Sequence, residues 1–200
     1  MKDKILESAT EMFLTYGFKS VTMDDIAEKM SISKKTIYTH FSNKTKLVEE
    51  TTFGMFECIS TGIDMICSLN NNPIEELFQI KKFVLDNLKD EKSSPLFQLQ
   101  KYYPKLHTNL TQKQFEVMKE CVATNLNRGV EGGFFRKEID IQFITRVYFK
   151  GMMGIKDVET FPSETFTMNY LLERYLEYHV RGIATEKGIQ TLEKVQNQYN

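Results

Sequence analysis

The sequence predicts an all-α protein, and three observations support this fold class. Apolar residues recur at three- and four-residue spacing through most of the 200-residue chain, as on helices with one buried face. Residues that favour helix starts, such as Thr22, Ser33 and Asp140, stand directly before several of these segments. The chain contains only 4 prolines and 10 glycines, and no stretch alternates convincingly like a β-strand. We therefore expect helices along the whole chain.

The first expected helix covers residues 2–16. Its apolar positions, from Ile5 to Tyr16, form one stripe at helical spacing. Gly17 follows this stripe directly and suits the left-handed stop that commonly ends a helix.

Two short helices follow, separated by a turn of about three residues. Thr22 and Asp25 have the spacing of a capping-box variant, which predicts a second helix over residues 23–30. Ser33 suits the N-cap of a third helix over residues 34–41. Two short helices joined in this way form the helix-turn-helix pattern.

The remaining helices are expected from the same cap and periodicity signals. They cover residues 44–69, 73–88, 95–107 with an interruption at Pro104, 111–128 after Thr111, 140–158 after Asp140, 163–181 after Ser163, and a short polar tail helix from Thr185. A polar loop is expected over residues 89–94.

The charge distribution is uneven although the net charge is only −1. Residues 1–48 carry 8 lysines and 6 acids, whereas the other residues carry 18 basic and 21 acidic side chains. Four lysines and a histidine, but no acid, lie within residues 33–47. Such a cluster suggests a small anionic target, although charge alone favours a solvated helical face.

No apolar run is long enough to cross a membrane, and the N-terminus lacks the apolar centre of a signal peptide. The three cysteines, Cys58, Cys67 and Cys121, show no paired metal-site spacing. We expect reduced and mostly buried thiols, a cytoplasmic protein, and no metal or cofactor.

The third expected helix carries the functional signal. The N-terminal side chains of a helix in the major groove meet base edges, and Lys34, Lys35 and Thr36 occupy these positions. Lysine donates to guanine, whereas threonine bonds several bases or touches a thymine methyl group. The side chains expected at phosphates lie at helix starts or farther along this helix; they are Thr22, Ser33, Tyr38, His40 and Lys44. Thr22 and Ser33 also suit plain caps, and Tyr38 equally suits packing on its own domain.

Residues 4–48 resemble the DNA-binding domain of the TetR family of transcriptional regulators. The matching stretches are Ile5-Leu6-Glu7-Ser8-Ala9, Met12-Phe13, Tyr16-Gly17-Phe18, Val21-Thr22-Met23-Asp24-Asp25-Ile26-Ala27, Ser33 to Phe41, and Asn43-Lys44 with Leu47. The resemblance implies a DNA-binding domain over residues 1–48 and a helical effector-binding and dimerisation domain over residues 49–200. It also implies a homodimer, commonly a repressor, that binds a palindromic operator and is released by a small effector.

Two positions depart from the family pattern. Ser31 stands where the family often has glycine, so the turn between the second and third helices is open to a different shape. Lys35 replaces a residue that is commonly small, which makes the operator sequence unpredictable by analogy.

The resemblance places the dimer interface on the last two long helices. The expected interface residues form two apolar stripes: Ile141, Ile144, Tyr148, Gly151, Met152 and Ile155, then Leu171, Leu172, Tyr175, Leu176 and His179. The alternative is that these stripes belong only to the core of one chain.

The effector site is expected to be hydrophobic or aromatic, because phenylalanine, tyrosine and methionine are abundant. The candidate lining residues are Phe83, Phe97, Gln98, Tyr102, Tyr103, His107, Phe115, Met118, Asn125, Phe149 and Met152. Each of them also fits an ordinary core position.

Two other classes of protein fit the sequence less well. The sequence contains no GxSxG, HExxH, phosphate-binding-loop or GxGxxG motif, so nothing indicates an enzyme. The second alternative is a helical dimeric protein-interaction module whose lysine cluster is merely solvated. Charge reversal at Lys34 and Lys35 distinguishes this module from a DNA-binding regulator.

Overall fold

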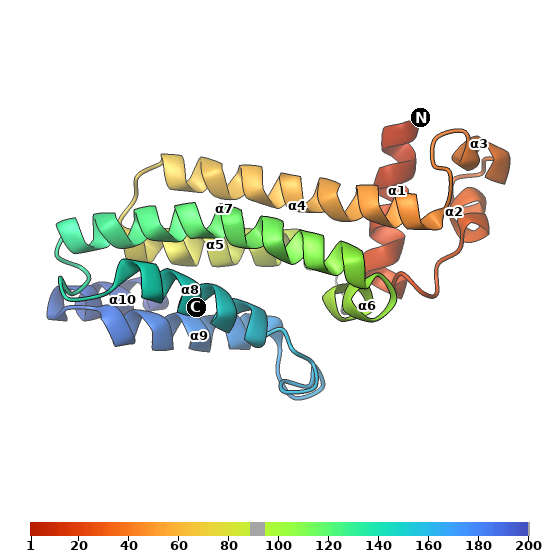
Figure 1. Ribbon diagram of the computed structural model, residues 1–200. Coiled ribbons are helices and arrows are strands. Elements are labelled where there is room, and N and C mark those ends of the chain that lie inside the picture. Colours follow the sequence, from red (N-terminus) through yellow and green to blue (C-terminus); the bar gives the residue numbers. More distant parts are fainter. Residues whose placement is uncertain (89–94, 200) are drawn as a thin grey trace. The chain divides into compact units, whose positions relative to one another are not determined.

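The computed structural model describes residues 1–88 and 95–199, and these residues form ten helices without a β-strand (Figure 1). The loop expected over residues 89–94 lies outside the described residues. By packing, the chain divides into two compact units, residues 1–59 with 88–113 and residues 60–87 with 114–200. The expected boundary at residue 48 divides the chain by function, into a DNA-binding segment and the remainder, and it stays a prediction.

The first unit contains the three short N-terminal helices. They are α1 (Lys2–Tyr16), α2 (Met23–Lys29) and α3 (Lys34–Tyr38). The unit also contains the first part of α4 (Lys44–Ser68), α6 (Pro95–Tyr102) and the first part of α7 (Pro104–Glu131). The expected helix-turn-helix is therefore present.

Local hydrogen bonds explain where α2 begins. The Thr22 hydroxyl accepts a bond from the Asp25 backbone N–H, with 3.2 Å between the heavy atoms. The Asp25 carboxylate accepts in return from the Thr22 backbone N–H at 2.7 Å. The expected capping box is confirmed, and it satisfies two donors that a helix start otherwise leaves free.

The turn between α2 and α3 keeps a glycine-like shape without a glycine. Ser31 has a φ of 53°, in the left-handed region. Its backbone N–H donates to the carbonyl of Glu28 at 3.0 Å, and that of Ile32 donates to the carbonyl of Ala27 at 3.0 Å. These two bonds are those of a Schellman motif, in which glycine usually occupies the left-handed position.

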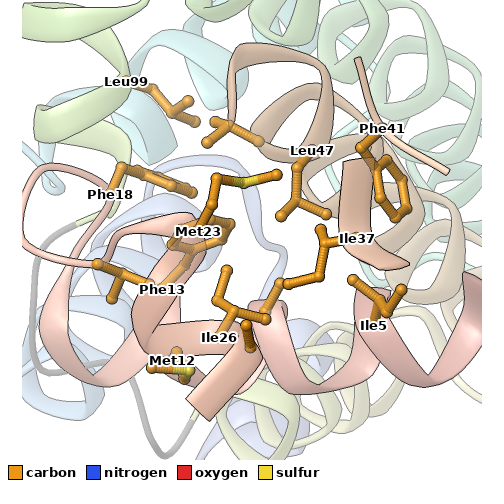
Figure 2. Packing of buried hydrophobic residues seen from close by; sticks show 14 of the residues in the cluster. Ile5, Met12, Phe13, Phe18, Met23, Ile26, Ile37, Phe41, Leu47 and Leu99 are labelled. Carbon is orange, nitrogen blue, oxygen red and sulfur yellow. The ribbon is translucent and has the colours of Figure 1, made fainter. Parts of the chain in front are cut away.

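The core of the first unit includes residues from far along the chain. Figure 2 shows Leu99 of α6 in the same apolar cluster as Phe18, Met23 and Leu47. Leu110 of α7 is buried in this cluster as well. At the end of α1, Gly17 has a φ of 84°, and the Gln98 side chain accepts a bond from the Lys19 N–H at 3.2 Å. The φ of Gly17 is positive, but its ψ of 156° lies outside the left-handed helical region, so Gly17 does not form the expected left-handed stop. Helix α6 completes the core under the N-terminal helices.

The second unit consists of long helices around its own cores. It contains α5 (Pro73–Leu88), α8 (Ile141–Gly154), α9 (Met168–Ile183) and α10 (Glu186–Tyr199), together with the remaining parts of α4 and α7. One apolar cluster joins residues of α5, α7, α8, α9 and α10, and a smaller one joins Ile155 with Leu171 and Leu172. None of the helices in the described ranges is both long and apolar enough to span a membrane.

Several expected helix bounds were wrong. The helix expected from Thr111 begins at Pro104, which suits a first helical position because it needs no N–H donor. The helix expected after Ser163 begins only after Thr167, whose hydroxyl accepts from the Tyr170 N–H at 3.3 Å. Two ends come early: α3 stops at Tyr38 and α8 at Gly154.

The C-terminal helix is more than a polar tail. The Thr185 hydroxyl accepts from the Gly188 N–H at 3.2 Å and caps α10 as expected. However, α10 runs for 14 residues and buries Leu192 and Val195 against the second unit. It is therefore a structural element of that unit.

Candidate nucleic-acid interface

Two buried side chains hold α3 on the first unit. Ile37 and Phe41 are fully buried in the apolar cluster, whereas the side chains on the opposite side of this segment are exposed to solvent. The exposed group comprises Lys34, Lys35, Tyr38, Thr39 and His40, and Thr36 is half-buried. The structure therefore brings the three expected base-reading residues together at the exposed start of α3.

A small hydroxyl network fixes the start of α3. The Ser33 hydroxyl accepts from the Thr36 backbone N–H at 3.1 Å, which confirms Ser33 as the N-cap. The Ser33 and Thr36 hydroxyl oxygens lie 2.8 Å apart and share a hydrogen bond. A hydroxyl group has one donor and two acceptor positions, so each retains capacity for a further bond.

Lys34 has an acidic partner in its own chain. Its ammonium lies 2.7 Å from the Asp24 carboxylate, and both side chains are largely exposed. This hydrogen bond raises the pKa of Lys34 above its usual value, so the side chain stays charged. Exposed pairs are weak, so Lys34 can leave Asp24 for another acceptor.

Lys44, at the start of α4, is less exposed than the two lysines of α3. Burial lowers the pKa of its ammonium, while the nearby Asp25 carboxylate opposes that shift. The ammonium donates to the backbone carbonyl of Lys19 at 3.4 Å. Next to it, the Asn43 side chain accepts from the Lys46 N–H at 2.9 Å and caps α4, a role the residue pattern did not reveal. Lys44 is therefore half-buried and hydrogen-bonded, unlike the freely exposed Lys35.

Thr22 serves mainly as a cap. Its side chain is exposed, but its hydroxyl and backbone N–H both bond Asp25. The two bonds from Thr22 lower the pKa of the Asp25 carboxyl group. Tyr38, in contrast, is 44% exposed, which favours the outward orientation over packing on its own domain.

The expected effector-site residues fall in both units. Those in the first unit are Phe97, Gln98, Tyr102, Tyr103 and His107; those in the second are Phe83, Phe115, Met118, Asn125, Phe149 and Met152. Phe97 and Tyr102 are exposed, whereas the Phe115 and Phe149 rings pack edge to face with centroids 5.0 Å apart. Asn125 already donates to Glu76 at 2.7 Å and to the Pro73 carbonyl at 2.9 Å.

A half-open surface pocket of about 410 Å³ is lined by residues of α1 and α2. Its lining residues are Glu11, Met12, Thr15, Tyr16, Asp25, Glu28 and Lys29, none of which belongs to the expected effector site. Its charged lining does not match the apolar character expected for the effector site.

The expected dimer residues pack within their own chain. Tyr148 and Leu176 are buried in the large cluster of the second unit, and Ile141, Ile144, Met152 and Tyr175 pack against it. Ile155, Leu171 and Leu172 form the smaller cluster, His179 contacts the ring of Tyr148 at 4.7 Å, and the Tyr175 side chain covers Gly151. These contacts fit the intrachain alternative for both stripes.

The opposite faces of α8 and α9 carry apolar side chains that the periodicity did not single out. Phe143 is 61% exposed, Val147 is 44% exposed and Tyr178 is 77% exposed. Phe143 and Val147 are four residues apart on α8, so they share one helix face. The signal was present as a second, weaker apolar stripe on each helix.

The cysteines also differ from expectation. Cys58 is exposed, while Cys67 and Cys121 are half-buried, so the expectation of mostly buried thiols was wrong.

Comparison with known proteins agrees with the helix-turn-helix. The family described as "Bacterial regulatory proteins, tetR family" matches residues 5–51. The biofilm operon icaADBC HTH-type negative transcriptional regulator IcaR of Staphylococcus aureus (strain Newman) is 33% identical over 87 residues. This match covers 43% of this chain and 47% of IcaR, so the chain spans about half the length of this relative.

Two further proteins match over most of the chain. The HTH-type transcriptional repressor KstR2 of Mycobacterium tuberculosis (strain CDC 1551 / Oshkosh) is 21% identical over 188 residues, which are 92% of this chain and 94% of KstR2. The solved structure of SmeT, the repressor of the Stenotrophomonas maltophilia multidrug efflux pump SmeDEF, has a TM-score of 0.72 at 15% identity. That structural match covers 93% of this chain and 91% of SmeT.

The fold and the exposed start of α3 define an all-helical protein with an N-terminal helix-turn-helix head. Residues 5–51 are therefore similar to the bacterial regulatory proteins of the tetR family. The three named proteins are described as a negative transcriptional regulator or as repressors.

Proposed function

We propose that the protein is a DNA-binding transcriptional repressor that acts as a homodimer and responds to a small effector. The observation that carries this proposal is the exposed start of α3, which presents Lys34, Lys35 and Thr36 above the buried anchors Ile37 and Phe41. A short rigid helix held in this way fits the DNA major groove. IcaR and KstR2 are both named as negative regulators or repressors, which supports repression over activation.

The proposed contacts divide into base readers and phosphate contacts. Lys35 and Thr36 reach base edges, and Lys34 joins them after it leaves Asp24. The phosphate contacts are Thr22, Ser33, Tyr38, His40 and Lys44. Tyr38 and His40 are exposed and contribute most, whereas Thr22 and Ser33 contribute through helix starts that their side chains already cap.

The homodimer is proposed to form through the outer faces of α8 and α9. Phe143, Val147 and Tyr178 supply exposed apolar area on these faces. Gly154 and Gly182 lie on the same faces, and a Cβ atom at either position would meet no atom within 4 Å apart from its chain neighbours and the backbone of its own helix. Close approach of a second copy therefore remains open there, and two heads are needed to read a palindrome.

The effector is proposed to be small and hydrophobic or aromatic. The supporting observation is the set of buried and half-buried aromatic and methionine side chains in the second unit, which includes the Phe115–Phe149 pair. The solved structure of KstR2 is described as that of a ketosteroid transcriptional regulator, which gives an apolar class of compound to screen first. A raised melting temperature with such a compound, and release of bound DNA, are the expected readouts.

The decisive experiment is selection of bound duplexes from a random DNA pool by the purified protein. We expect an enriched palindrome whose half-sites lie about one DNA turn or slightly more apart. Log affinity should fall with log salt by about 0.9 for each phosphate contacted. A pool without any enriched sequence, together with a flat salt response, would favour a protein-interaction module instead.

Charge reversal tests the residue assignment. Lys34→Glu with Lys35→Glu should reduce affinity for the selected duplex by at least about 100-fold, because two favourable contacts become repulsive. The matched control reverses two exposed lysines of the second unit, Lys137→Glu with Lys194→Glu, and should change affinity by less than about threefold. Equal losses of DNA affinity in both double variants would show that only the net charge matters. That result would contradict the assignment of Lys34 and Lys35 as base contacts.

A further inference from the structure

Two of the three thiols lie against each other in the second unit. Cys67 is in the last turn of α4 and Cys121 is in the middle of α7, 54 residues later. Their sulfur atoms are 3.1 Å apart and share a hydrogen bond. The third thiol, Cys58, is exposed and belongs to the other unit. The pair is therefore a specific arrangement and not a consequence of a cysteine-rich sequence.

The surroundings make the two thiols unequal. The bond from the Cys121 thiol lowers the pKa of Cys67, and the same bond together with burial raises the pKa of Cys121. Three charged groups act on the pair: the Arg128 guanidinium favours the Cys67 thiolate, whereas the Glu76 and Asp64 carboxylates oppose it. Cys67 is consequently the nucleophile of the pair, and Cys121 is placed to attack it afterwards.

We propose that Cys67 and Cys121 form an oxidisable dithiol that a hydroperoxide converts to an intramolecular disulfide. In the first step, the Cys67 thiolate attacks the terminal peroxide oxygen, the O–O bond breaks, and the alcohol or water leaves after protonation. In the second step, the Cys121 sulfur attacks the resulting sulfenic acid of Cys67 and displaces water, forming the S–S bond. Two thiols and one hydroperoxide thus yield one disulfide, one alcohol or water, and one further water molecule.

The geometry favours a disulfide over other uses of the pair. A disulfide bond is about 2.05 Å long, so the sulfur atoms must approach by only about 1 Å from their 3.1 Å separation. Over the described residues, no third His, Cys, Asp or Glu side chain joins the thiols in a cluster able to hold a metal ion. Both cysteines are half-buried, which favours the approach of a small peroxide over that of a second protein molecule.

The disulfide would join the end of α4 to the middle of α7 and enclose all of α5. A cross-link between residues so far apart in sequence restricts the unfolded chain strongly. The oxidised second unit should therefore melt roughly 5–10 °C higher than the reduced one. Formation of this disulfide does not require the protein to bind DNA.

The test treats the reduced full-length protein with equimolar hydrogen peroxide and then alkylates the remaining thiols. We expect a product two hydrogens lighter that takes up one alkyl group instead of three, located on Cys58. Peptide mapping should link the segments that contain residues 67 and 121, and a dithiol reductant should reverse both the link and the rise in melting temperature.

Five variants make the result specific. Cys58→Ser should still form the disulfide, whereas Cys67→Ser should not. Cys121→Ser should stop at a Cys67 sulfenic acid that dimedone traps. Cys67→Ala and Cys121→Ala, with helical content checked by circular dichroism, exclude misfolding as the cause. Three alkylated thiols after peroxide treatment, Cys58-linked dimers as the main product, or separate sulfinic acids on Cys67 and Cys121 would each overturn the proposal.

Discussion

The two compact units bury different kinds of side chain. Buried polar residues of the first unit are limited, among the described residues, to Thr51 and Thr52, and the Thr51 hydroxyl bonds carbonyls of its own helix. The second unit buries Glu76, Lys81, Asn125, Thr145 and His179. An apolar core tolerates changes that keep its volume, whereas a buried charge depends on one particular partner. The first unit is therefore stabilised mainly by apolar packing, whereas the second unit also depends on specific buried polar pairs.

The largest effect is expected when a pair in the second unit is broken. The buried Glu76 carboxylate accepts from Arg128 at 2.8 Å and from Asn125 at 2.7 Å. Glu76→Ala removes the acceptor and should lower the free energy of unfolding by about 4 kcal/mol in urea titrations. The neighbouring Glu75 is less buried, and Glu75→Ala should cost below about 1 kcal/mol. Similar losses in both variants would contradict the importance of the buried pair.

The next effect depends on pH. Burial lowers the pKa of His179 from 6.5 to about 4. Its tyrosine neighbours do not titrate in this range, since burial raises the pKa of Tyr175 to about 12 and raises that of Tyr148 as well. Between pH 6.5 and pH 4 His179 therefore binds a proton in the unfolded chain but stays neutral in the folded chain. The free energy of unfolding consequently decreases as the pH is lowered from 6.5 to 4.

For His179 this loss should reach about 3 kcal/mol at pH 4. His179→Phe keeps a ring against Tyr148 and removes the titrating group. The variant should therefore lose less stability than the original protein when urea unfolding is compared at pH 7 and pH 4. Parallel pH dependences for the two proteins would place the acid sensitivity elsewhere, and the contrast between the units would weaken.

The smallest effect compares one residue in each unit. Ser31 and Asn70 have φ values of 53° and 52°, and each follows the end of a helix. Asparagine tolerates the left-handed region better than serine, so Ser31→Gly should stabilise by about 0.5–1 kcal/mol. Asn70→Gly should change stability by less than about 0.3 kcal/mol. Equal gains at both positions would indicate that neither side chain matters for the turn.

Local chemistry explains which features the sequence predicted well. The starts of α2, α3 and α8 depend on Thr22, Ser33 and Asp140, whose side chains bond backbone groups only three residues away. Because these hydrogen bonds join residues close in sequence, the helix-turn-helix could be predicted from the sequence alone. Thr111 has a similar pattern but lies inside α7, because an upstream start at Pro104 was available.

Long-range packing explains which features the sequence did not predict. The stripes of α8 and α9 identified a buried face, but their spacing cannot tell a core within one chain from an interface between two. Phe143 of α8 and Tyr178 of α9 differ from the core positions in their exposure, which depends on the packing of the whole unit. Similarly, no local pattern brings Cys67 and Cys121 together, because their contact depends on how α4 and α7 pack.

The place of Leu99 and Leu110 in the first core limits how such heads can be exchanged between proteins. A chimera joined at residue 48 would carry away Phe18 and Met23 but leave behind the two leucines that share their core. The transplantable module instead consists of two separate segments, residues 1–59 and residues 88–113. A single junction cannot transfer both segments. Recombination at one crossover would therefore produce a first unit that lacks part of its apolar core.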